Sequence, residues 1–301
     1  MSLAPTERYA RFAWATVGFN LLVIVWGAFV RATGSGAGCG KHWPLCDGEV
    51  TPPLESTAQL IEFVHRLTSG MALLLTIGLV VWACRLFAKG HRARRAAWAT
   101  LGFMISEALL GAGLVLFGLV ENDDSVARAL VICAHLVNTL ALLGFMALTG
   151  WWSTRPGRLN LNGPEARAFL IAIIGVFLIG ISGAIAALGD TLFPAKSLAE
   201  GFAADIAPGA HFLLRLRALH PLLAVVVGAG LIGIGLQYKT TPLGRALLVV
   251  VGIQIAVGFI NLGLLAPVWL QLIHLLIADI LWLTLILLAV SRLESEAIPR
   301  N

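Results

Sequence analysis

The sequence predicts an all-α integral membrane protein whose eight transmembrane helices form two pseudo-symmetric four-helix bundles. Hydrophobic residues make up 58% of the 301 residues and charged residues only 12%, and the mean hydropathy is +0.89. Soluble domains average about 25% charged residues, so this composition excludes an ordinary soluble protein. Lys and Arg outnumber the acids 21 to 16. In a membrane protein the placement of these charges matters more than their sum, and we expect no nucleic-acid partner.

Eight apolar segments are long enough to cross a hydrocarbon core about 30 Å thick, which takes roughly 20 helical residues. No small-residue cleavage site follows the first segment, so we expect it to be a membrane helix rather than a removable signal peptide. The segments lie at about 10–31, 59–86, 95–120, 127–152, 165–189, 212–237, 243–265 and 268–291.

The basic residues predict the orientation of these helices. Most of the 21 Lys and Arg residues fall on the side of the N-terminus, in connectors such as 89–95 and 153–158. By the positive-inside rule, both termini are then cytoplasmic. The long loops at 32–58 and 190–211 face outward. We therefore expect a multi-pass membrane protein.

The first outer loop contains RATGSGAGCGKHWPLC at residues 31–46. A phosphate-binding P-loop is excluded because Ser35 and His42 occupy positions that need Gly and then Ser or Thr. The Rossmann glycine pattern fails because Cys39 stands at its last glycine. Two cysteines seven apart on the oxidising side predict a disulfide between Cys39 and Cys46. In the chain-entropy model such a short loop is stabilised by roughly 2–3 kcal/mol.

The two halves of the chain repeat each other weakly. EALLGAG at 107–113 parallels QIAVGFI at 254–260, and each stretch is followed by a helix that carries one histidine. Four helices per half is an even number, so the halves share one orientation, as in a parallel repeat about the membrane normal. The halves are predicted to be residues 1–153 and 154–301.

Four histidines are predicted to lie at one depth in the membrane: His65, His135, His220 and His274. Each is on an even-numbered segment, about 9–14 Å below its outer end at 1.5 Å per residue. The simple alternative is that each one hydrogen-bonds a neighbouring helix. Four imidazoles matched between repeats instead favour metal ligands, because polar groups in hydrocarbon are rare and costly. Imidazole commonly ligates haem iron; the sequence disfavours zinc and leaves copper open. The pairs His65 with His135 and His220 with His274 predict two haem sites towards the extracytoplasmic side.

Three arginines at the outer helix ends are candidate partners for the haem propionates. Arg31, Arg66 and Arg217 lie where the positive-inside bias disfavours basic residues. Arg66 adjoins His65, and Arg217 lies one turn before His220. Guanidinium groups match carboxylates in geometry, so we predict that these arginines bind the cofactors. The alternative is interfacial snorkelling towards anionic lipid.

The halves differ at one informative position. Glu62 stands three residues before His65, whereas Arg217 stands three residues before His220. Residues at i and i+3 share a helix face, so Glu62 is predicted to approach the first-half macrocycle as a proton donor or acceptor. One half would then carry out chemistry while the other only holds a cofactor. Glu107, also at membrane depth, is expected to bond across helices.

Several of these stretches together resemble the heme A synthase family of bacterial eight-helix membrane haem O hydroxylases. The resemblance covers essentially the whole chain, and the combination of motifs is more specific than any one of them. The stretches are GAFVRATGSGAGCGKHWPLC (27–46), EFVHRLTSG (62–70), AHLVNT (134–139), ALGDTLFP (187–194), LRALHP (216–221) and LIHLLIAD (272–279).

The resemblance implies an enzyme that converts haem O to haem A for cytochrome oxidase. Two oxygen-dependent hydroxylations of a porphyrin methyl group give a geminal diol, which loses water to leave a formyl group. By position, His65 and His135 would flank the substrate haem O, and His220 and His274 would hold a haem b that delivers electrons. Glu62 would be catalytic. Two histidines on the substrate iron leave no place for O2, so one of His65 and His135 is predicted to be labile.

Alternatives and partners follow from the same features. A di-haem b membrane cytochrome explains the four histidines but not the Glu62/Arg217 difference, and a parallel-repeat transporter ranks third. Some members of the resembled family carry a second cysteine pair, which this sequence lacks between 190 and 211. Expected partners are the lipid bilayer, a haem O synthase, and a ferredoxin-like or quinol electron donor. Association into a homo-oligomer is compatible with the sequence.

Overall fold

The computed structural model describes residues 3–53, 55–155 and 157–295, so the outermost ends of both predicted halves lie outside the described residues. Within these described residues, eight helices are long and apolar enough to cross a membrane, which confirms the predicted fold class and makes the chain a multi-pass membrane protein. They are α1 (Pro5–Ala32), α2 (Thr57–Leu86), α3 (Arg92–Leu116), α4 (Val126–Thr154), α5 (Pro164–Leu192), α7 with α8 (Phe212–Arg217 and Leu219–Gln237), α9 (Pro242–Gly263) and α10 (Val268–Leu293).

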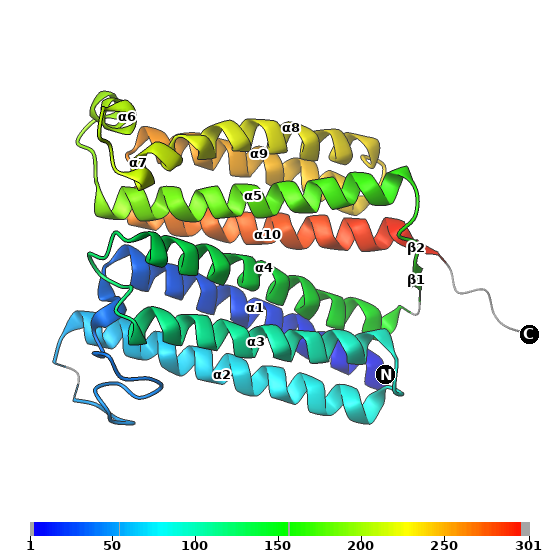
Figure 1. Cartoon of the computed structure of the whole chain (residues 1–301). Helices are drawn as coiled ribbons and strands as arrows, with labels where there is room; N and C mark the ends of the chain where they lie inside the picture. Colours follow the sequence, from blue (N-terminus) through cyan, green and yellow to red (C-terminus); the bar gives the residue numbers. More distant parts are fainter. Residues whose placement is uncertain (1–2, 54, 156, 296–301) are drawn as a thin grey trace, which may run out of the picture.

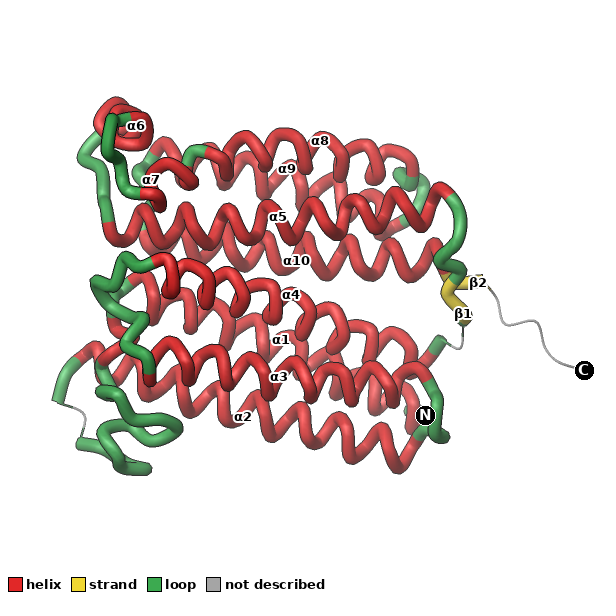
Figure 2. The backbone as a smooth tube through the Cα atoms, in the orientation of Figure 1, coloured by secondary structure: helices red, strands yellow, loops and turns green. Residues whose placement is uncertain are grey.

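The helices form two four-helix bundles that lie side by side (Figures 1 and 2). In the first bundle α1 and α3 each pack against both α2 and α4, so α2 and α4 are diagonal partners. In the second bundle α5 and α9 separate α8 from α10 in the same way. The even-numbered spans of the sequence, which carry the four histidines, are therefore the diagonal helices of each bundle.

The bundles meet through α1 and α4 on one side and α5 and α10 on the other. This interface holds the centre of the apolar core, including Leu143, Met146, Leu285 and Leu288, none of which is exposed. The indole of Trp282 crosses it and donates a 2.7 Å hydrogen bond to the carbonyl of Leu140. A polar group that satisfies its one donor in this way can be buried at little cost.

Several helices begin where a side chain caps the free backbone N–H groups of the first turn. The hydroxyl oxygens of Ser56, Ser125 and Thr241 accept hydrogen bonds from the backbone N–H groups of Gln59, Arg128 and Gly244. These caps place the first residues of α2, α4 and α9 at 57, 126 and 242, one or two residues before the start that hydropathy alone predicts.

The sixth predicted helix, 212–237, is interrupted, contrary to the expectation of one continuous helix. α7 ends at Arg217 and α8 begins at Leu219. The cause is Pro221, which lacks an N–H and whose ring clashes with the carbonyl four residues earlier, that of Arg217. The break, at Ala218, falls two residues before His220.

The connectors add small elements that hydropathy does not predict. The second long loop contains α6 (Leu198–Ile206), which is capped by the Ser197 hydroxyl. A 3-10 helix, η1 (Ser35–Ala37), begins the first long loop. At the opposite end of the molecule β1 (Arg158–Leu159) pairs antiparallel with β2 (Glu294–Ser295) and ties the inter-bundle connector to the end of α10. Figure 1 shows both long loops at one end and the start of α1 at the other.

Gly244 is predicted to be essential to the turn between α8 and α9. A Cβ atom there would lie 2.1 Å from the carbonyl oxygen of Tyr238, whereas one at Gly252 in the same helix meets nothing within 4 Å. We expect Gly244→Ala to lower the free energy of unfolding by about 1–3 kcal/mol. The matched Gly252→Ala variant should be neutral or up to about 1 kcal/mol more stable. Thermal unfolding in detergent checks this, and equal stability of the two variants would contradict it.

Candidate functional site

The four predicted ligand histidines lie at matching depths on the diagonal helices. His65 follows the first residue of its span, Thr57, by eight residues; the corresponding spacings are nine for His135 after Val126, eight for His220 after Phe212 and six for His274 after Val268. At 1.5 Å per residue these places are about 9–14 Å from the loop end of the molecule. Each bundle thus presents two imidazoles to its own interior at one level.

The imidazoles of the second bundle face each other directly. The ring centres of His220 and His274 lie 6.4 Å apart, with their planes perpendicular. Two imidazoles bonded to opposite sides of one metal ion, at about 2 Å each, have centres about 6 Å apart. The hydroxyl of Ser182 lies 3.1 Å from Nδ1 of His220 and leaves Nε2 for a ligand. The amide nitrogen of Gln254 lies 3.3 Å from Nε2 of His274.

The imidazoles of the first bundle differ in their partners. Nδ1 of His65 is buried, and no hydrogen-bond partner for it lies among the described residues. Nδ1 of His135 is also buried and lies 3.0 Å from Oε1 of Glu107, an ion-pair distance without the alignment of a full hydrogen bond. A histidine that served only to bond a neighbouring helix would have this nitrogen paired. The alternative of four satisfied structural histidines therefore fits poorly.

Three of the four imidazoles pack against a glycine on a neighbouring helix of the same bundle, a contact that was not predicted from the sequence. The distances are those from a Cβ atom built at the glycine to the nearest ring atom. They are 2.8 Å for Gly27 to His65, 2.9 Å for Gly183 to His220 and 3.1 Å for Gly258 to His274. A side chain at any of these positions would displace the ring, so the glycines are needed to seat the histidines.

Gly111 holds the corresponding position opposite His135, but less tightly. A Cβ atom there would lie 3.8 Å from Nε2, an ordinary contact. Gly111 stands four residues after Glu107, as Gly258 stands four residues after Gln254. That spacing is the one signal in the sequence that could have pointed to the glycines.

Two imidazoles in each bundle are too few ligands for a bare metal ion but enough for a metal that is already bound by a macrocycle. Within the described parts of the chain, no three His, Cys, Asp or Glu side chains converge as ligands of one ion. Zinc and copper sites in proteins generally use three or four protein ligands. Haem iron needs only one or two axial ligands, because the porphyrin supplies four nitrogens. The paired imidazoles and their glycine seats thus fit haem better than a bare metal ion.

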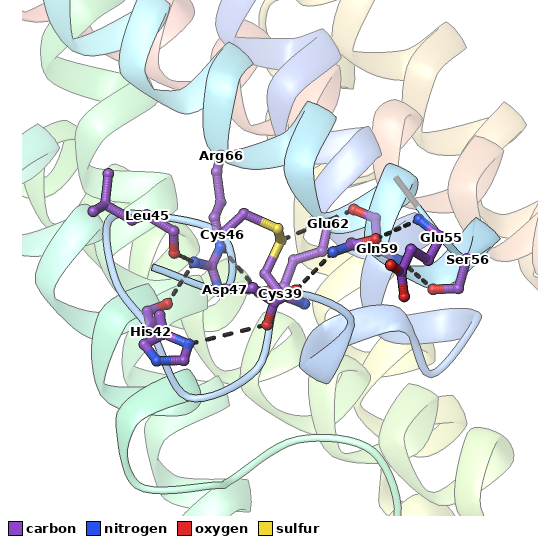
Figure 3. The surroundings of a disulfide bond; sticks show 10 residues. All are labelled: Cys39, His42, Leu45, Cys46, Asp47, Glu55, Ser56, Gln59, Glu62 and Arg66. Carbon is purple, nitrogen blue, oxygen red and sulfur yellow. Dashed lines mark hydrogen bonds and ion pairs between the residues drawn. A yellow bond between two sulfur atoms is a disulfide. The ribbon is translucent and has the colours of Figure 1, made fainter. Parts of the chain in front are cut away.

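Glu62 lies where the first bundle meets the disulfide loop (Figure 3). It is only 3% exposed. Oε2 accepts a 2.7 Å hydrogen bond from the backbone N–H of Cys39. Oε1 accepts from the guanidinium of Arg66, one turn further along α2. Both carboxylate oxygens are therefore engaged, and the group that the sequence singled out for chemistry also anchors the loop.

The loop itself is closed by the predicted disulfide, which is confirmed between Cys39 and Cys46. The Arg66 guanidinium donates to the loop carbonyls of His42 and Leu45 at 2.5 Å each. Figure 3 shows these bonds converging from α2 onto the loop. The loop is thereby fixed over the loop end of the first bundle, one helical turn of α2 away from His65.

Arg31 and Arg217, the other predicted cofactor-binding arginines, already have partners within the protein. Arg31 on α1 donates across the interface to the Ala187 carbonyl at 2.8 Å and, further along, to Thr191 and Gln271. It therefore joins the two bundles. Arg217 forms ion pairs with Asp190 at 2.8 Å and Asp205 at 2.6 Å. Their binding of propionates stays a prediction.

Comparison with known protein families gives a match over most of the chain. A family model described as cytochrome oxidase assembly protein, COX15-CtaA, matches residues 10–286. The chain belongs to the COX15-CtaA family. This matched range includes all four histidines, the cysteine pair and Glu62, and it confirms the resemblance found in the sequence.

Named relatives fall into two groups. A heme A synthase of Alkalihalophilus pseudofirmus is 42% identical over 127 residues, which is 42% of each chain. Another, of Symbiobacterium thermophilum, is 39% identical over 102 residues, 34% of this chain and 33% of that one. A protein of Thermus thermophilus named protoheme IX farnesyltransferase is 47% identical over 306 residues, 99% of this chain. The chain spans about half the length of that relative.

The close contact between Gly27 and the His65 ring predicts that a side chain at position 27 will weaken haem binding in the first bundle. In Gly27→Ala the new methyl group would lie 2.8 Å from the His65 ring, whereas Gly18 on the same helix has nothing within 4 Å. We expect Gly27→Ala to lose at least half of the haem bound in the first bundle, and Gly18→Ala to retain it. Absorption spectra of the purified proteins, normalised to protein, provide the measurement. Normal haem content in Gly27→Ala would show that the ring is not held at this seat.

Proposed function

We propose that this chain is a heme A synthase, which converts haem O to haem A by successive oxygen-dependent hydroxylations of a porphyrin methyl group. The observation that carries the proposal is the pair of imidazoles at one level in each bundle, with buried ring nitrogens and glycine seats. Membership of the COX15-CtaA family supports it. Partial matches to proteins named heme A synthase support it further.

The two bundles would divide the work. His65 and His135 would hold the substrate haem O, and His220 and His274 a resident haem b that passes electrons towards it. Haem iron would supply the redox chemistry with O2, and the protein supplies binding, orientation and protons. Glu62, held by Arg66 and the Cys39 N–H, is the acid nearest to His65 along α2. We assign it to proton transfer or orientation at the reacting substituent.

The strongest rival from the comparisons is farnesyl transfer to protohaem, the activity in the name of the Thermus relative. Release of diphosphate from a farnesyl donor calls for Mg²⁺ held by carboxylates. Within the described residues, no three His, Cys, Asp or Glu side chains converge on one site. We propose that this activity belongs to the half of the relative that this chain does not match. A di-haem b cytochrome remains the second candidate, because two histidine pairs alone would satisfy it.

The same relative supports a partner for this chain. Farnesyl transfer to protohaem, the activity in the name of the relative, makes the substrate that we propose here, and this chain matches about half of that polypeptide. We propose that a haem O synthase delivers haem O to the first bundle within the membrane. The sites would then face the extracytoplasmic side of a bacterial cell membrane, with electrons supplied by a ferredoxin-like protein or a quinol.

Replacing Glu62 by glutamine tests the proposal. Glutamine keeps an oxygen for the Cys39 N–H but removes the charge and the acid proton. We expect conversion of haem O to fall about 100-fold or more, the range of a lost general acid or base, while haem b content stays normal. The measurement is chromatography of haems extracted after expression with a haem O source.

Asp47→Asn is the matched control, because it removes a charge from the same loop. Asp47 accepts a 2.6 Å hydrogen bond from Gln59 and lies 4.0 Å from the loop residue His42, which is not one of the four predicted ligands. It should retain haem A formation. If the wild-type protein yields only haem b and no oxidised product, the chain is a cytochrome and the proposal is wrong.

A further inference from the structure

A polar cluster surrounds His135 in the first bundle, and Glu107 is its centre. The Glu107 Oε2 atom accepts a 2.5 Å hydrogen bond from the amide of Asn138. The hydroxyl of Thr139 reaches Oε1. The side-chain oxygen of Asn138 in turn accepts a 2.5 Å hydrogen bond from the Ser106 hydroxyl. The carboxylate is therefore held in place at two oxygens, one of which lies 3.0 Å from Nδ1 of His135.

The second bundle lacks this cluster although it repeats the histidine. His274 corresponds to His135, and Gln254 corresponds to Glu107, four residues before the facing glycine in each half. Gln254 carries no charge, and its amide nitrogen lies near Nε2 of His274 rather than Nδ1. The residues that correspond to Ser106, Asn138 and Thr139 are apolar: Ile253, Ile277 and Ala278.

A carboxylate beside a ligand histidine changes how strongly that histidine binds a metal. When Nε2 bonds the metal, Nδ1 carries the proton, and a carboxylate next to it draws that proton away from the ring. The imidazole becomes more basic and donates more strongly, which favours the oxidised metal. A glutamine beside Nδ1 would offer only a neutral dipole and a weaker effect, and Gln254 lies near Nε2 of His274 instead.

We propose that Glu107 is a positioning residue that makes His135 the strong, permanent axial ligand of the first-half haem. This inference rests on the proposed function, because it assumes that His135 ligates haem. Glu107 would lower the reduction potential of the first-half haem below the value that glutamine would give at the same site. His65, whose buried Nδ1 has no partner among the described residues, would be the weaker ligand that leaves to open the iron. The open face would then be the one on α2, the helix that also carries Glu62 and Arg66.

Reciprocal substitutions at the repeated position provide the test. Glu107→Gln gives the first half the residue of the second, and Gln254→Glu does the reverse; both are close in size, so the bundles should fold. In a redox titration of the protein loaded in both halves, we expect Glu107→Gln to raise one potential. A tenfold loss of preference for ferric over ferrous haem corresponds to 59 mV for a one-electron couple. Gln254→Glu should lower the other potential.

The outcomes separate this inference from the proposed function. Two transitions that neither variant moves would overturn the role of Glu107 while leaving two haem sites. Absence of any haem transition in the wild-type protein would overturn the proposed function itself. A shift of the same transition by both variants would contradict the assignment of one residue to each half.

Removal of each first-half ligand tests the assignment of the labile side. We expect His65→Gly to keep haem in the first half, with an open position that binds carbon monoxide in the reduced state. His135→Gly should lose most of that haem. The reverse pattern, with haem retained only in His135→Gly, would overturn the proposal. Carbon monoxide difference spectra and haem content of the purified variants are the readouts, and neither depends on turnover.

Discussion

A polar ring in a hydrocarbon interior must find a partner, and this constraint organises both bundles. An unpaired polar group in an apolar medium costs roughly 2–7 kcal/mol, and lipid offers no water to reduce that cost. Trp282 meets the constraint through the carbonyl of Leu140. The predicted ligand histidines do not meet it fully with protein groups, since Nδ1 of His65 and of His274 is buried without a partner among the described residues.

Close approach of helices sets where the rings can stand. Glycine exposes backbone, so a ring can be seated directly on the neighbouring helix, as His65 is on Gly27 and His220 on Gly183. Above the first pair, Glu62 and Arg66 fix the disulfide loop with a short run of charged hydrogen bonds. The position of that loop therefore depends on the same helix face that carries His65, and a shift of α2 would move both.

The sequence predicts the parts of this arrangement that depend on local composition. Spans of about 20 apolar residues and the Cys39–Cys46 pair can be read directly, because each lies within one contiguous stretch. The break at Ala218 was missed although Pro221 was visible, since hydropathy does not register a lost N–H. Contacts across the bundles are of another kind: Arg31 reaches Gln271, 240 residues away. The sequence around either residue does not indicate this contact. The contacts between glycines and histidines on neighbouring helices are equally invisible in the local sequence.

Comparison of the two halves distinguishes the residues that both share from those that occur only in the first. Both halves keep a histidine pair, and in both a glycine lies opposite each ring. These shared residues hold the rings and would serve any haem. The differences gather around the first pair: Glu62 against Arg217, and Glu107 with Asn138 and Thr139 against Gln254 with two apolar residues. A half that only carried electrons would have no use for acids on two sides of its histidine pair, because each acid in the membrane interior costs desolvation energy. Glu62 and Glu107 beside the first pair therefore support the proposed assignment of the chemistry to the first bundle.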